Sequence, residues 1–294
     1  MAKTVIDDEL LQQIELLQML VRNNVAGMFG GNHKSKTYGS SCEFADYREY
    51  TPGDDITKID WNAYARFEKL YTKLFLDERQ MHTRIYIDAS NSMGFGKSKK
   101  DEQALKIAAA FAYLSVCEMD KVSVYTVQNK QLNAVISGML GKEAFISSIN
   151  ALNEVTFSGD SYISDAIVPS TVGYGDGMSI IISDFLTDND YEAAIDHLTG
   201  KKRHVLCVQV LSKEELRPKA RGKMHFFDSE DSGKYYRKNI TREIAQAYKK
   251  AVEYATGRIR DYCAARGADY ILVCDEDPVG KLFFERLTGE GVLK

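Results

Sequence analysis

Proline is scarce in this sequence, with four residues in 294, and 44% of the residues are apolar. Disordered and fibrous chains depend on biased compositions that are poor in apolar residues, so both classes are excluded. A chain of this length can bury a core of its own. One large domain with an additional part is therefore the expectation.

The sequence also has no excess of basic residues and no long apolar run. Its net charge is −4 and its isoelectric point is about 5.8, whereas a value above about 9 is typical of nucleic-acid-binding domains. No segment approaches the roughly 18 apolar residues of a membrane span. Acidic residues, Asp7, Asp8, Glu9 and Glu15, stand where an export signal would have basic ones. We expect a soluble, unexported protein that binds no nucleic acid and has no membrane span.

Cysteine motifs and zinc motifs are missing as well. The cysteines are odd in number and show no C-x-x-C spacing, which predicts reduced thiols in a cytoplasmic protein. The residues are Cys42, Cys117, Cys207, Cys263 and Cys274. The scattered histidines lack the spacing of zinc ligands, and no G-x-x-x-x-G-K-[ST] loop is present, so we expect no ATP hydrolysis by this chain.

Strands and helices alternate along most of the chain. The apolar spacing predicts helices over 8–26, 104–118, 145–152, 161–168, 191–200 and 241–266, and strands over 70–76, 84–88, 122–127, 132–136, 179–183, 204–210 and 270–274. The stretch up to about residue 62 reads as irregular, with Asp55 or Asp60 capping a short helix. Ser98 to Asp101 match a capping box, and Asp277 with Pro278 opens a closing helix.

This alternation predicts an α/β protein with a parallel sheet and helices on both faces. We expect residues 1–80 to form an N-terminal helical and irregular extension packed on a main domain of residues 81–294. A hairpin insertion is expected near 223–239, from two short β-prone runs separated by turn residues.

The loop after the strand at 84–88 is the strongest functional signal. Asp88 ends the strand, and Ser90 and Ser92 follow at two-residue spacing. Ligands of open α/β sheets bind beyond the carboxyl ends of strands, and hard oxygen donors favour a hard cation, magnesium first. The alternative for this loop alone is a capped turn between a strand and a helix. Asp184, at the end of the buried strand 179–183, is a second acid of the same kind.

Three segments in order resemble the metal-ion-dependent adhesion site of von Willebrand factor A domains. They are Asp88-x-Ser90-x-Ser92, Gly159-x-Ser161-x-Ile163-x-x-Ala166 and Ile182-Ser183-Asp184. The resemblance implies a von Willebrand factor A-like fold with a Rossmann-type, mostly parallel sheet. It also implies a metal site formed by Asp88, Ser90, Ser92, Ser161 and Asp184.

The N-terminal part resembles the signature of one bacterial branch, the domain-of-unknown-function 58 family. The matching residues are Gly31, His33, Ser35, Glu43, Phe44, Arg48, Tyr50, Pro52 to Asp55, Ile59 to Trp61, Ala65 and Arg66. With these residues the resemblance covers nearly the whole chain. We expect the aromatic residues of this segment, Phe44, Tyr47, Tyr50 and Trp61, to pack internally in preference to forming a docking face.

A protein-binding role follows from the chemistry and from the resemblance. Magnesium prefers six oxygens, so five protein groups leave a position for an acidic residue of a partner. Manganese and calcium are the alternatives to magnesium. The family implies a non-enzymatic adaptor or chaperone-like partner of an AAA+ ATPase of the MoxR type. Ser161 stands where the family usually has threonine, and Asp160 beside it adds a carboxylate whose part in the site is left open.

Two other functions stay open at this point. One is a magnesium- or manganese-dependent hydrolase, for example a phosphatase, that uses the same strand-end carboxylates. Ser90 argues against it, because a phosphatase with Asp88 as phosphoryl acceptor requires an acid at that position as proton donor, and a serine hydroxyl is a poor one. The other is a scaffold in which the metal only stabilises the loop.

Overall fold

The computed structural model describes residues 4–24, 34–38, 44–78, 81–94, 98–175, 177–187, 189–217, 222–227 and 235–281. The chain forms two compact units. Unit 1 contains Met1–Phe29 and Met81–Lys294, and unit 2 contains Gly30–Gln80.

Unit 1 is built on a six-stranded sheet with the order β11-β8-β7-β4-β5-β6. The strands are β4 (His82–Asp88), β5 (Lys121–Gln128), β6 (Gln131–Met139), β7 (Met178–Ser183), β8 (His204–Leu211) and β11 (Asp269–Cys274). Neighbouring strands are parallel except for β6, which pairs antiparallel with β5 at the edge. Every residue of β7 is buried, as expected for a strand covered on both faces. The predicted α/β class with a mostly parallel sheet is confirmed.

The strand order reverses between β4 and β7. The chain adds β5 and β6 on one side of β4, and then β7, β8 and β11 on the other side. Crossover connections to the two sides leave a crevice beyond the carboxyl ends of the two central strands. This is the place where Asp88 and Asp184 end their strands.

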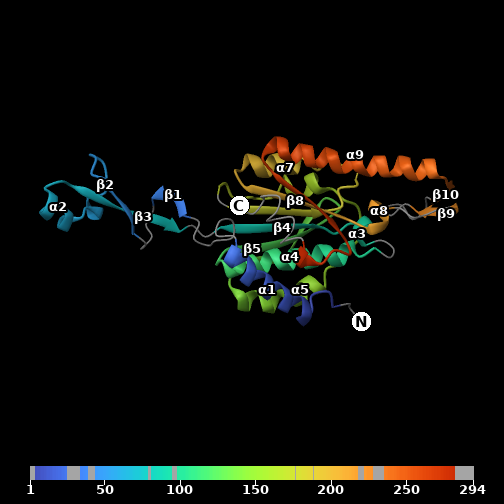
Figure 1. Cartoon of the computed structure of the whole chain (residues 1–294), viewed down its shortest axis with the longest axis horizontal. Helices are drawn as coiled ribbons and strands as arrows, with labels where there is room; N and C mark the ends of the chain where they lie inside the picture. The colour runs from blue at the N-terminus through green and yellow to red at the C-terminus, as the bar shows by residue number, and fades with distance from the viewer. Residues whose placement is uncertain are drawn as a thin grey trace. The chain divides into compact units, whose positions relative to one another are not determined.

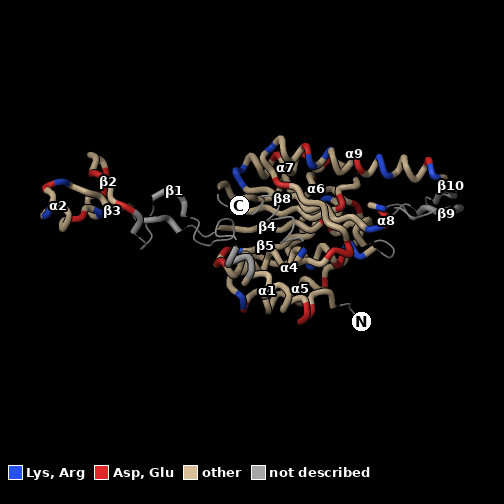
Figure 2. The backbone as a smooth tube through the Cα atoms, viewed as in Figure 1, with Lys and Arg blue, Asp and Glu red and all other residues tan. Residues whose placement is uncertain are grey.

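Helices cover both faces of this sheet (Figure 1). One face carries α1 (Asp8–Asn24), α4 (Lys100–Cys117) and α5 (Lys142–Asn153), and the other carries α6 (Ile163–Ile167), α7 (Glu192–Gly200) and α9 (Arg242–Arg266). Strand β4 contributes to both layers, because Ile85 and Ile87 pack in the core with α4 whereas Tyr86 packs in the core with α7. Figure 2 shows that the strands are almost free of charged residues and that both signs of charge alternate along α9.

Helix α1 belongs to unit 1, which differs from the predicted boundary of the N-terminal extension at residue 80. Ile6, Leu10, Ile14 and Leu17 are all buried in the same core as α4. A helix with an apolar stripe packs where that stripe can be buried, and the sheet face with α4 provides the place. No helix among the described residues is long and apolar enough to cross a membrane.

Unit 2 contains a three-stranded antiparallel sheet with the order β1-β3-β2. Its strands are β1 (Lys34–Tyr38), β2 (Phe44–Glu49) and β3 (Tyr71–Glu78), with a 3₁₀ helix, η1 (Ile56–Lys58), and a short helix, α2 (Trp61–Phe67). Of these three strands, only β3 was predicted from the sequence. The prediction that residues up to about 62 are irregular was therefore wrong for β1 and β2. Their polar sequences, KSKTY and FADYRE, lack the apolar alternation that marks a half-buried strand.

In unit 2 the predicted helix caps are confirmed, whereas the predicted packing of the aromatic side chains is not. Asp55 accepts the Thr57 N–H to open η1, and Asp60 accepts N–H groups from the first turn of α2. Trp61 is 61% exposed and Tyr47 is 46% exposed, so the expected internal packing was wrong for these two side chains. A small sheet with one two-turn helix offers little interior to bury them.

The C-terminal third contains a hairpin, a long helix and a last strand. Strands β9 (Gly222–Phe227) and β10 (Tyr235–Ile240) pair antiparallel as predicted, and the connection at 228–234 lies outside the described residues. The closing helix starts as α10 (Val279–Lys281), and its expected continuation through Phe283, Phe284 and Leu287 also lies outside the described residues. The four cysteines that the structure describes are free thiols, whereas Cys42 lies outside the described residues.

Candidate metal site

The candidate site lies at the switch point of the unit 1 sheet. Asp88 is the last residue of β4, and Asp184 directly follows β7, its parallel neighbour. Ser161 comes from the segment before α6 and forms a parallel bridge with Asn129, just beyond β5. Three segments far apart in the sequence therefore meet where the sequence predicted a site.

Asp88 accepts three hydrogen bonds in a closed environment. Its Oδ2 accepts the hydroxyls of Ser161 at 2.7 Å and Ser183 at 2.6 Å, and its Oδ1 accepts the Ser90 N–H at 3.1 Å. The carboxylate is 1% exposed. Burial, followed by the negative charge of Asp184, raises the pKa of Asp88 above its ordinary value, although the hydroxyl bonds act in the opposite direction. A cation is the natural partner for a buried carboxylate of this kind.

The serine pair lies beside this carboxylate. The Ser90 and Ser92 hydroxyl oxygens are 3.1 Å apart. Ser90 is fully buried, whereas Ser92, in the short helix α3 (Asn91–Gly94), is only partly covered. Of the five predicted ligands, Ser92 is the one that is not buried, so the site opens to solvent on its side.

Backbone hydrogen bonds hold the Asp-Ser loop against the Ser161 segment. The Asn91 N–H donates to Gly159 O at 2.8 Å, and the Ser158 N–H donates to Ala89 O at 2.7 Å. Gly159 has φ +78°, and a Cβ there would lie 2.6 Å from Asn129 Oδ1. Glycine is therefore required at this contact, which brings Ser161 to Asp88.

Asp160 is oriented by the same asparagine. Its N–H donates to Asn129 Oδ1 at 3.0 Å, and its carbonyl accepts the Asn129 N–H at 2.9 Å. The residue is half-buried next to Ser161. These two bonds place the Asp160 backbone at the rim of the site.

Asp184 has a different partner from the other four residues. Its Oδ2 accepts a hydrogen bond from Lys100 Nζ at 2.9 Å, and both side chains are 3% exposed. Lys100 Nζ also lies 2.9 Å from Glu215 Oε1. Burial lowers the pKa of Lys100, but the two carboxylates outweigh this effect and hold the pKa above its ordinary value. The site thus contains an internal cation.

The Asp275 carboxylate connects the helices that carry Lys100 and Glu215. Asp275, which follows β11, accepts the Lys99 N–H at 3.1 Å and the Lys213 N–H at 3.1 Å. These groups lie at the starts of α4 and α8 (Lys213–Leu216). The predicted helix start at Ser98 to Asp101 is confirmed only in part. The Ser98 hydroxyl accepts the Lys100 N–H at 3.3 Å, but the cap position is Lys99, whose side chain accepts no helix N–H and whose own N–H donates to Asp275.

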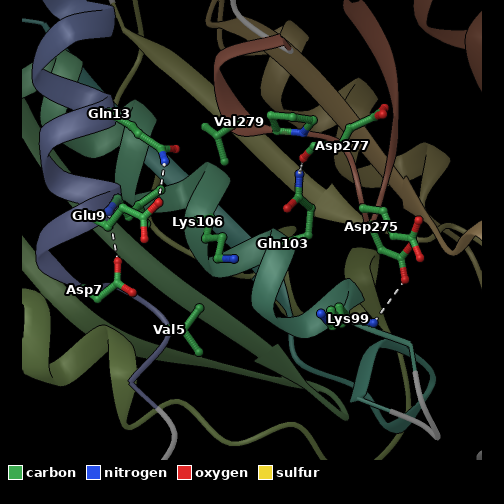
Figure 3. A pocket seen from close by; sticks show the side chains of 13 residues that line it. Val5, Asp7, Glu9, Gln13, Lys99, Gln103, Lys106, Asp275, Asp277 and Val279 are labelled. Carbon is green, nitrogen blue, oxygen red and sulfur yellow. Dashed lines mark hydrogen bonds between the residues drawn. The ribbon is translucent and has the colours of Figure 1, made fainter.

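A cavity of about 380 Å³ lies beside this junction, between α1, the start of α4 and the segment after β11 (Figure 3). Asp275 on its wall points to Lys99, and the Gln103 amide donates to Asp277 O at 2.8 Å. Asp7 caps α1 through the Leu10 N–H, and Asp277 pairs with Lys281. Asp7, Asp275 and Asp277, which line the cavity, thus already have partners within the protein.

The donor set fits a hard divalent cation. Two carboxylates and three hydroxyls provide oxygen ligands of the kind that magnesium and calcium prefer. Asp88, Ser90, Ser92 and Ser161 lie in one hydrogen-bonded cluster, and the charge of Asp184 reaches it. The described residues contain no group of three or more His, Cys, Asp or Glu side chains arranged around a metal, consistent with a cluster whose ligands are mostly hydroxyls.

Four residues of this region were missed by the sequence analysis as functional groups. Ser183 was part of a matching motif, but its hydroxyl bond to Asp88 was not expected. The long-range contacts of Lys100, Glu215 and Asp275 have no local signal, because their partners are 84, 115 and 176 residues away. Only the folded arrangement identifies them.

The fold and the site define a doubly wound α/β protein with an oxygen-rich cluster at its switch point. Residues 46–257 match the family described as "Protein of unknown function DUF58". The chain belongs to this family, and the expected family membership is confirmed.

Relatives and solved structures are distant. Uncharacterized proteins of Mycobacterium tuberculosis and Mycobacterium bovis are each 24% identical over 217 residues, covering 71% of this chain and 68% of the relative. An aerotolerance-related membrane protein from Bacteroides fragilis is 15% identical, with a TM-score of 0.41 over 72% of this chain and 96% of that one. The SpRpn10 VWA domain is 8% identical, with a TM-score of 0.38 over 69% of this chain and 92% of that one.

Proposed function

We propose that this chain is a non-enzymatic protein-interaction module whose contact with its partner depends on a divalent metal. Magnesium is the first choice, with manganese and calcium as alternatives. The ligands in this proposal are Asp88, Ser90, Ser92, Ser161 and Asp184. The ion would supply a Lewis-acidic centre with a position for a carboxylate of the partner.

The observation that carries this proposal is the convergence on Asp88. Hydroxyls of Ser161 and Ser183 and the N–H of Ser90 all meet this one buried carboxylate. Such a cluster needs a counter-charge, because a buried carboxylate is costly without one. Its position at the switch point supports a binding role, since ligands of this class of sheet bind there.

The same contacts support binding over hydrolysis. Three protein donors hold both oxygens of Asp88 in a fixed orientation, which suits a ligand group. Ser90, two residues further on, remains a poor proton donor. We therefore propose that the site binds a partner protein and does not cleave a substrate.

The partner in this proposal is an AAA+ ATPase of the MoxR type, for which the chain acts as an adaptor or chaperone-like subunit in the cytoplasm. The family resemblance carries this part. An acidic residue of the partner would complete the coordination of the metal, which predicts that removal of the ion weakens the complex.

A pull-down with a MoxR-type ATPase from the same genome tests the proposal. We expect capture in magnesium, loss of capture in EDTA, and loss with Asp88→Ala in either buffer. Ser92→Thr, which keeps the hydroxyl at the open side of the site, serves as the matched control and should retain capture. Equal capture by wild type and Asp88→Ala, with and without magnesium, would contradict a metal-bridged contact.

A further inference from the structure

Lys100 places a positive charge beside Asp184, one of the proposed metal ligands, although a site made of oxygen ligands alone could hold a metal without it. It is the one lysine among the described residues that is buried, at 3% exposure. Its ammonium contacts Asp184 Oδ2 and Glu215 Oε1, each at 2.9 Å. A buried ammonium at this distance neutralises a carboxylate that a metal would otherwise use.

The ammonium is held there by the surrounding elements. Asp275 ties the starts of α4 and α8 through its two backbone contacts. Glu215 is fixed by a capping box with Ser212, in which the Ser212 N–H donates to Glu215 Oε2 at 2.7 Å. Lys100 and Glu215 are therefore held in a defined arrangement by protein groups.

The charges of this cluster also match a divalent ion when Lys100 is present. When all of these groups are ionised, Asp88, Asp184 and Glu215 carry three negative charges, and Lys100, paired with Asp184 and Glu215, carries one positive charge. The remaining charge of about −2 equals that of one divalent cation in magnitude. Glu215 offers the ammonium a partner that lies outside the proposed ligand set.

We propose that Lys100 regulates the metal site by competing with the divalent ion for the Asp184 carboxylate. This inference rests on the proposed metal-binding function. The ammonium contacts both Asp184 and Glu215. A divalent ion held by Asp184 would compete with this ion pair, and Lys100 would keep Glu215 as its partner, so the ion pair would set the metal affinity and link the site to α8.

Calorimetric titration of the full chain with Mn²⁺ and Mg²⁺ tests the competition. We expect Lys100→Met to bind the ions more tightly than wild type by about tenfold, because the competing charge is removed. Lys100→Arg keeps the charge and is the matched control, with no gain in affinity. Asp88→Asn should abolish binding in every background.

The double variant Lys100→Met with Glu215→Gln separates competition from a general charge effect. It removes one charge of each sign, and glutamine keeps the capping box, so the folded state is protected. Tighter binding than wild type supports competition for Asp184. Affinity equal to that of wild type would mean that only net charge matters, and would overturn the inference.

The remaining outcomes distinguish this inference from the proposed function. Weaker binding by Lys100→Met would make Lys100 a support for Asp184 and would overturn competition while leaving the metal site intact. Binding by Lys100→Met but not by wild type would overturn the proposed function, because the natural chain would then hold no ion, and would overturn its regulation by Lys100 as well. Absence of binding in all variants would overturn the proposed function, and this inference with it.

Discussion

At the scale of single residues, the site depends on hydroxyls that satisfy a buried acid. Ser161 and Ser183 both donate to Asp88 Oδ2. Hydrogen bonds to a charged group contribute more than neutral ones, at about 1.5–3 kcal/mol each. The side chain at position 161 therefore affects both the stability of the fold and the capacity to hold a metal.

Replacement of Ser161 by alanine tests this dual role. We expect Ser161→Ala to lower the free energy of unfolding by about 1.5–3 kcal/mol, because Asp88 loses a hydroxyl donor in a buried environment. Urea denaturation in EDTA measures this cost without metal. Ser161→Thr keeps the hydroxyl and should remain close to wild type, so equal losses in the two variants would show that packing, and not the hydroxyl, is what matters.

At the scale of elements, helix ends are determined partly by local sequence and partly by distant residues. Helix α9 begins at the Thr241 cap and ends at Gly267, which has φ +68°. Both signals are local, and the predicted helix at 241–266 has nearly the same bounds. The start of α4 combines both kinds of signal, since the Ser98 hydroxyl accepts the Lys100 N–H at 3.3 Å and Asp275, far away in the sequence, accepts the Lys99 N–H.

Two glycines of the same helix region give opposite predictions. Gly267→Ala should destabilise the protein by about 1 kcal/mol, because an L side chain is strained in the left-handed conformation. Gly257→Ala should stabilise it by about 0.5–1 kcal/mol, because alanine is favoured inside a helix and a Cβ there meets no atom within 4 Å. Thermal melting of both variants checks the signs. Stabilisation by Gly267→Ala would contradict the assigned helix end, and destabilisation by Gly257→Ala would contradict free space for a side chain inside the helix.

At the scale of the whole molecule, buried acids make stability depend on pH. Asp120, 5% exposed, accepts the Met81 N–H at 3.0 Å, just before β4. Burial raises the pKa of Asp120 from 3.8 to about 6. The folded state therefore binds more protons than the unfolded state between about pH 4 and 6, and stability falls as the pH rises through this window.

Asp120→Asn should remove this loss. We expect the variant to be more stable than wild type at pH 7 by about 2–3 kcal/mol, as an order of magnitude, and the two proteins to converge below about pH 4. Denaturation across this pH range measures the difference. Asp120→Ala is the control, because it lacks the acceptor for the Met81 N–H and should be less stable than Asp120→Asn at every pH.

Most of the fold was predictable because its signals are local. Apolar runs such as the buried strand β7 and the stripe of α1 have periods that identify strands and helices. Strands β1 and β2 were missed because their polar sequences carry no such period. The sequence does not specify which of the two units α1 joins, since an apolar stripe does not determine which surface will cover it.

The sequence by itself determined where the candidate site lies. Asp88, Ser90, Ser92, Ser161 and Asp184 sit at strand ends or in short motifs, and a parallel sheet brings such ends to one edge. Only the tertiary structure decided that Lys100 and Glu215 join this site and that Asp275 holds both of their helices. These contacts connect residues far apart in the chain, and neither spacing nor composition records which distant charges will be buried together.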